Sequence, residues 1–354
     1  MSTDLAEIAE RRAAFAALSA ALLLSEPGPR TAPYIERVPE LAALADPACG
    51  VEFERIFLRE VAPYESVFRS DTAERGGAVA SRVADQYDDI GFDEHRTGQW
   101  RVAGPDHLGL ELRAYAFLVG LEAAAWRSDR PDEATRHVEA QRRLFADHLA
   151  WWAGLAVDAL ARSAAGTPYE QLVEAVDHYL ADEIDRLRPL PLLDASQLPP
   201  DDPIGRLGPR RLARHLLAPA RSGLWLGVAE IGDAARRLGF PWRPMDGRQN
   251  LVPLVGAAHD AGEIAQLVSP WAVLAADAVD RHRRRAADQP GAELAWQHYA
   301  ALAAQTARYL QDLEARGLHR DDDREMVIRV SGSGAADAVD ALRRMGHSVE
   351  ILDD

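Results

Sequence analysis

The side chains best suited to acid–base or metal chemistry stand at the start of one apolar run, 103-AGPDHLGLELRAYAFL-118. Asp106 and His107 are adjacent there, and Glu111 follows His107 by four residues. A histidine and a carboxylate at this spacing share one face of a helix, where they can hold a metal ion or form a solvated pair. The segment 177-DHYLAD-182 offers a similar group. Because neither group has the spacing of a zinc motif such as H-E-x-x-H, we predict no metal site.

Other catalytic patterns are weaker. The chain contains no G-x-S-x-G elbow, and Ser331, Ser333 and His347 are too loosely placed to indicate a triad. The turn 331-SGSG-334 is similar to a phosphate loop, but Asp337 stands where the third glycine should be, and its carboxylate would repel phosphate. We therefore predict no nucleophile, no bound cofactor and no enzymatic activity.

The Asp106-His107 pair is also the expected start of a helix. Pro105 suits the first turn of a helix, and an acidic residue in that turn favours the helix dipole. Two apolar faces follow, the first with Leu108, Leu112, Tyr115 and Val119 and the second with Leu110, Ala114, Phe117 and Leu121. A helix that is apolar on both sides lies in the middle of its bundle. We expect Asp106 and His107 to emerge there at a wet rim, where they could receive a guanidinium.

The elements that position these residues are predicted to be helices. Residues 4–25 keep a 3.6-residue apolar period that ends at 25-SEPGP-29. The segment Thr167-Pro168-Tyr169-Glu170 has the form of a capping box that starts a helix reaching about Leu187. Further helices are expected at 34–45, 50–60, 65–90, 106–127, 132–162, 209–218, 227–238, 247–262, 268–287 and 290–316. The apolar stretch 13–24 is too short to span a membrane and lacks a basic leader, so we expect no export signal.

The chain divides at 189-PLPLLDASQLPPDDPIGRLGP-209, whose six prolines exclude a continuous helix. We predict a helical core at 1–188, a linker or crossover at 189–209, a helical extension at 210–318 and a small tail at 319–354. In the tail, the β-type runs 326–330 and 348–352 flank a helical pattern at 335–345, which predicts two parallel strands. Two strands need further packing, on the helical body, a second copy or a partner.

The charge and cysteine content limit the class of partner. The chain has 354 residues, 40 Lys and Arg against 56 Asp and Glu, and a formal charge of −16. This balance argues against nucleic acid or an anionic membrane as the main partner, and it permits a cationic peptide. The single cysteine, Cys49, cannot form a disulfide within the chain, and a cytoplasmic location fits best.

Three motifs in a fixed order resemble a known family. The segments 62-APYESVF-68, 104-GPDHLGLEL-112 and 145-FADHLAWW-152, on an acidic helical chain, are similar to the hallmarks of the TorD/DmsD family of redox-enzyme maturation chaperones. The resemblance covers roughly residues 5 to 190 and implies an all-α bundle of the TorD/DmsD type. One departure is Gly104, which replaces the family's glutamate. Residues 219–242 are similar to the C-terminal extensions of longer members.

The resemblance implies a peptide-binding role and a client. Family members bind the twin-arginine leader of the catalytic subunit of a molybdopterin oxidoreductase, hold it back from export and assist cofactor insertion. An apolar groove suits the apolar part of such a leader, and acidic side chains suit its arginines. The residues implied for peptide binding are Tyr64, Glu65, Ser66, Asp106, His107, Leu108, Glu111, His148 and Trp152.

Two other functions stay open at this point. The chain could be an all-helical metal- or nucleotide-dependent enzyme that uses His107, Glu111 and His148. It could also be a structural subunit that remains attached to an oxidoreductase. A homodimer formed by exchange of helices across 189–209 is a further possibility. By itself, the apolar pattern around Trp151 and Trp152 favours core positions over a groove.

Overall fold

The computed structural model describes residues 2–93, 104–188, 204–205 and 207–316. Within these ranges every regular element is a helix, and the β-type pairing is one isolated antiparallel bridge between Tyr64 and His107. The predicted all-α fold is therefore confirmed. No helix in these ranges has the length and apolar character that a bilayer crossing requires. The strand-helix-strand unit predicted at 319–354, and most of the segment 189–209, lie outside the described residues.

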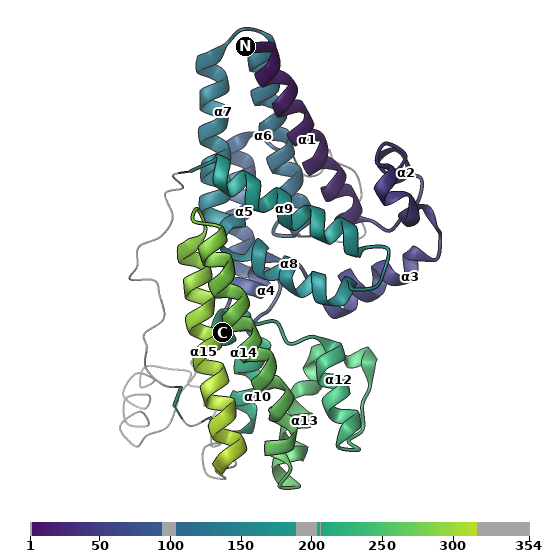
Figure 1. Ribbon diagram of the computed structural model, residues 1–354, viewed down its shortest axis with the longest axis vertical. Coiled ribbons are helices and arrows are strands. Elements are labelled where there is room, and N and C mark those ends of the chain that lie inside the picture. Colours follow the sequence, from purple (N-terminus) through teal and green to yellow (C-terminus); the bar gives the residue numbers. More distant parts are fainter. Residues whose placement is uncertain (1, 94–103, 189–203, 206, 317–354) are drawn as a thin grey trace, which may run out of the picture.

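The N-terminal bundle is built around three long helices: α1 (Ser2–Leu24), α6 (Leu108–Arg127) and α7 (Pro131–Leu144). α6 lies between the other two (Figure 1). Its first apolar face is buried, and its second face is buried or half-buried. Gly109 permits the close approach of α1, because an added Cβ would stand 2.6 Å from Cγ of Leu24. The predicted central position of this helix is thus confirmed.

The helix predicted at 65–90 is in fact two helices, α4 (Glu65–Arg69) and α5 (Gly77–Ile90). The break follows from the backbone at Gly76 and Gly77, where φ is 91° and 68°. These values suit glycine and cannot continue a right-handed helix. α5 ends on Gly91, another left-handed residue. The segment 70–76 therefore forms a loop over the start of α4.

The segment predicted as one helix at 132–162 stays helical but changes its winding. It consists of α7, the π-helical turn η4 (Phe145–Leu149) and α8 (Ala150–Ala164). A second π-helical segment, η2 (Glu54–Glu60), directly precedes the 62-APYES-66 motif. π-helical turns are rare and often occur at functional sites. Here each one lies next to a motif that the sequence singles out.

The remaining N-terminal elements are short, apart from α9. They are α2 (Ala32–Ile35), η1 (Pro39–Ala45), α3 (Cys49–Phe53) and α9 (Glu170–Arg186). α9 begins three residues after the predicted start at Thr167. Tyr169 N–H donates to the hydroxyl of Thr167 over 3.2 Å, and Gly166 N–H donates to the carboxylate of Glu170 over 2.9 Å. Both hydrogen bonds lie just before the first residue of α9. The predicted capping box is therefore wrong in its position relative to the start of the helix.

The C-terminal helices occupy the other end of the molecule (Figure 1). They are α10 (Pro209–Leu217), α11 (Pro219–Ser222), α12 (Val228–Arg237), η6 (Pro244–Asn250), α13 (Leu251–Asp260), α14 (Ile264–Asp288) and α15 (Glu293–Arg316). Long helices α14 and α15 pack along each other. Buried side chains form two clusters, and α15 contributes to both. The domain boundaries at 188 and 209 stay a prediction.

Ion pairs and a close ring contact join the C-terminal helices to the N-terminal bundle. Asp158 on α8 pairs with Arg281 on α14 over 3.1 Å, and Arg285 donates two hydrogen bonds to Asp177 on α9 over 2.6 and 2.8 Å. Gly154 on α8 faces the indole of Trp296 on α15, where an added Cβ would lie 2.3 Å from the ring. The C-terminal helices therefore pack directly on the N-terminal bundle.

Candidate functional site

The first two family-like motifs pair with each other through their backbones. Glu65 N–H donates to the carbonyl of Asp106 over 2.8 Å, and Leu108 N–H donates to the carbonyl of Pro63 over 2.9 Å. These bonds form the antiparallel bridge between Tyr64 and His107. The bridge fixes the start of α4 against the start of α6.

Asp106 strengthens this junction with its side chain. Its Oδ2 accepts a hydrogen bond from the N–H of Ser66 over 3.0 Å, which satisfies a free donor in the first turn of α4. The hydroxyl of Ser66 in turn accepts from Gly76 N–H over 2.9 Å. On the other side, the Tyr87 hydroxyl donates to the carbonyl of Pro105 over 2.7 Å. The Asp106 side chain therefore ties the start of α6 to the first turn of α4, and Tyr87 ties the preceding Pro105 to α5.

His107 caps α6. Its Nδ1 accepts from Gly109 N–H over 3.0 Å. The helix therefore begins at Leu108, two residues later than the predicted start at 106. Burial, with a smaller effect of the charge on Arg75, lowers the pKa of His107 to about 3. The ring is therefore neutral and carries its proton on Nε2, which has no hydrogen-bond partner among the described residues. Its edge packs against the Tyr64 ring at 4.9 Å.

The third motif reaches the same place through the π-helical turn η4. Nδ1 of His148 lies 2.8 Å from Oε2 of Glu65, and the other oxygen of Glu65 forms an ion pair with Arg69. Arg69 also donates to the carbonyl of Asp147 over 2.7 Å, and its guanidinium lies 5.7 Å from the ring of Trp151. Glu65 thus links α4 to the turn that precedes α8.

Glu111 is the most electrostatically unusual group in the cluster. The indole N–H of Trp152 donates to its Oε2 over 3.4 Å, while Oε1 has no partner among the described residues. Burial raises the pKa of this carboxyl well above its ordinary value, and the negative charges of Glu65 and Asp106 raise it further. Burial and the neighbouring negative charges therefore favour the protonated form of Glu111.

The predicted wet rim is wrong, because the cluster is buried. None of the nine predicted residues exposes more than 4% of its surface, and Asp106 and His107 expose 1% and 0%. The bridge between the motifs, α4 and α8 cover these side chains, and their polar atoms serve mainly internal contacts. The described residues contain no group of three His, Cys, Asp or Glu side chains placed to hold a metal ion.

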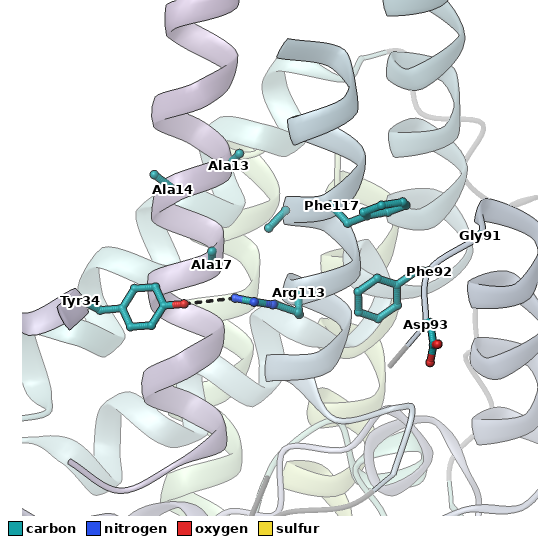
Figure 2. A pocket seen from close by; sticks show the side chains of 10 residues that line it. Ala13, Ala14, Ala17, Tyr34, Gly91, Phe92, Asp93, Arg113 and Phe117 are labelled. Carbon is teal, nitrogen blue, oxygen red and sulfur yellow. Dashed lines mark hydrogen bonds between the residues drawn. The ribbon is translucent and has the colours of Figure 1, made fainter. Parts of the chain in front are cut away.

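An open apolar groove lies farther along α6, and none of its lining residues is among the nine predicted for peptide binding. Its volume is about 570 Å³, and its lining residues are Ala13, Ala14, Ala17, Tyr34, Gly91, Phe92, Asp93, Arg113, Ala116 and Phe117. Figure 2 shows Tyr34 and Arg113 directed toward each other across α1, over 3.4 Å, with Phe92 and Phe117 on the far side. The sequence signal was the run of alanines on α1, which leaves room beside α6.

The family comparison covers the part of the chain that contains the motif cluster. Residues 8–158 match the family model described as nitrate reductase delta subunit, which spans α1 to α8 and all three motifs. No curated protein and no solved structure shows a match. The similarity to the nitrate reductase delta subunit family is thus confined to residues 8–158 of the 354-residue chain.

Proposed function

We propose that this protein is a cytoplasmic chaperone for the catalytic subunit of a molybdopterin oxidoreductase. It binds the client's N-terminal twin-arginine leader and its apo form, and it assists cofactor insertion before export. The name of the matched family points to a nitrate reductase-type client. The observation that carries the leader-binding part is the apolar groove between α1 and α6, inside the matched residues.

The groove suits the apolar part of a leader. Helix-lined apolar grooves bind amphipathic segments by burying their apolar side chains. Alanines on α1 leave a shallow floor, and Phe92 and Phe117 form a wall with ring centres 5.8 Å apart. Arg113 and Asp93 provide polar contacts at the edges of the groove. The formal charge of −16 favours the approach of a basic leader.

The nine motif residues act on peptide binding by positioning. Asp106 and His107 fix the first turn of α6, and the same helix carries Arg113, Ala116 and Phe117 into the groove one to two turns later. A shift at the start of α6 therefore displaces the wall of the groove. We propose that the motif cluster holds the binding surface in shape, and that the leader lies on α1 and α6.

Calorimetric titration with a synthetic leader tests this proposal. The leader is taken from a molybdopterin oxidoreductase encoded beside this chain, with a Lys-Lys leader as control. Ala17→Lys places a charge in the groove and should weaken binding about tenfold or more, since a charge there must be desolvated. Ala315→Lys, at an exposed position on α15, is the matched control and should bind as the wild type does. The Lys-Lys leader should bind more weakly, because lysine lacks arginine's forked contact.

Two results would count against the proposal. If the wild type binds no such leader, the chaperone function proposed here has lost its central support. If Ala17→Lys binds the leader as tightly as Ala315→Lys does, the groove is not the binding surface.

A further inference from the structure

A second cavity, of about 590 Å³, lies between the N-terminal bundle and the C-terminal helices. One side is formed by the end of η2, by Val67 on α4 and by the loop 70–76. The other side is formed by Trp225 and residues 247–249. Arg59, Arg75 and Arg248 all line it, and none of its ten lining residues is acidic. In a chain with a formal charge of −16, this concentration of positive charge is unexpected.

Arg248 carries a positive charge that the described residues do not balance. Its guanidinium donates to the carbonyls of Leu226 and Leu217, each over 2.7 Å, and lies 3.6 Å from the centre of the Trp225 ring. These partners are neutral, and Glu230 attracts the guanidinium only from beyond ion-pairing distance. Burial accordingly lowers the pKa of Arg248 to about 9. An anion in the cavity would offset the unfavourable burial of this positive charge.

The other two arginines face the same space from the N-terminal side. The guanidinium of Arg75 lies 4.7 Å from the centre of the Tyr64 ring, and no described carboxylate pairs with it. Arg59 is exposed and has a loose ion pair with Glu54 at 3.5 Å. The cavity therefore offers at least two cations without carboxylate partners, on opposite walls.

We propose that this cavity binds a small phosphorylated ligand, with its phosphate group held between Arg248 and Arg75. The guanidinium fork matches the oxygens of a phosphate, and a multiply charged anion balances more than one arginine. Both faces of the Trp225 ring are occupied, one by Phe68 at 5.0 Å and the other by Arg248. The ligand is therefore recognised by its phosphate groups and not by stacking of an aromatic ring.

The site lies where the C-terminal helices meet the N-terminal bundle. Arg75 belongs to the part that matches the family, whereas Arg248 belongs to the C-terminal helices beyond it. A ligand held by both arginines would stabilise the packing of the C-terminal helices on the bundle. The proposal depends only on the geometry of this cavity and is independent of client binding.

Calorimetric titration of the full chain with inorganic diphosphate, at constant ionic strength, tests the proposal without any client peptide. We expect saturable binding at one site. Arg75→Gln and Arg248→Gln should each weaken it about tenfold or more, the cost of losing a charge-assisted contact. Arg237→Gln, an exposed arginine outside the cavity, is the matched control and should leave binding unchanged.

Three results would overturn the proposal. They are the absence of saturable binding by the wild type, unchanged binding by Arg75→Gln, and citrate binding as tight as that of diphosphate. The last result would show that the cavity binds anions in general and does not select phosphate groups. Arg75 is exposed, so its substitution tests the site even if Arg248→Gln lowers the melting temperature.

Discussion

The carboxylate of Asp106 accepts a hydrogen bond from the backbone of Ser66, 40 positions earlier in the chain, over 3.0 Å. This contact gives the acid-histidine pair its main structural role. Asp106 and Ser66 are both buried, so water cannot replace this hydrogen bond if either residue is changed. The pair holds two helix starts together.

Asp106→Ala should lower the free energy of unfolding by about 1–3 kcal/mol, because Ser66 N–H would be left buried without a partner. Asp106→Asn should cost less, since its amide oxygen can still accept that bond. Urea unfolding followed by circular dichroism measures both. The exposed Asp233→Ala is the control, and an equal loss there would contradict the structural role of Asp106.

Glu111→Gln should become stabilising relative to the wild type as the pH rises. The folded pKa of Glu111 lies above its ordinary value of 4.5, because burial disfavours the charged form. A raised pKa gives stability that is present below the unfolded pKa and is lost as the pH rises through the folded pKa. Glutamine cannot lose a proton, so the variant escapes this loss.

The measurement is the difference in unfolding free energy between Glu111→Gln and the wild type, taken at several pH values from 4.5 upward. Glu139→Gln, an exposed position, is the control and should show a nearly flat difference. A flat difference for Glu111→Gln would mean that this carboxyl is charged in the folded protein.

His107→Asn should make the protein less sensitive to acid. The folded pKa of His107 is about 3, below the ordinary 6.5, so its contribution to stability is lost as the pH falls through this interval. Asparagine is a good N-cap and does not titrate, so it keeps the start of α6. Thermal melts between pH 7 and pH 4 should show a smaller decrease than in the wild type. His178→Asn, at an exposed position, should decrease as the wild type does.

Gly154→Ala should destabilise the packing of α15 on α8. The new methyl group would lie 2.3 Å from the Trp296 ring, and overpacking of this kind costs about 1–3 kcal/mol. Gly120→Ala in α6 is the matched control, because its methyl group meets nothing within 4 Å. That control should be neutral or stabilising, since alanine favours helix over glycine. Equal melting temperatures for the two variants would show that the Trp296 side chain can move aside with no loss of stability.

The helices were predictable because their apolar period is local. The period located α1, α6 and α14 within a few residues, and the two apolar faces of α6 predicted its central position. The period could not show the break at 70–76, because the apolar spacing continues across Gly76 and Gly77. Backbone angles at two glycines decided that break.

The burial of the motif cluster was not predictable from local pattern. Polar residues at a helix start normally face water, and the wet rim followed from that rule. The backbone bridge between Tyr64 and His107 overrides it, and such a long-range contact leaves no periodic signal. The groove was missed for a related reason. An alanine in an apolar pattern is expected to be buried in the core, and the space beside the alanines of α1 depends on where Phe92 and Phe117 lie in the fold.

The π-helical turn at Phe145–Leu149 affects how this segment responds to a change of length. A π-turn completes one helical turn with one residue more than an α-turn, so it accommodates the extra residue without rotating the helix that follows. Removing one residue from this turn would restore an ordinary α-turn and leave α8 facing nearly the same way. Trp152 would then still face Glu111. A relative with one residue fewer here would keep the junction between α6 and α8, although the spacing of its motifs would differ by one.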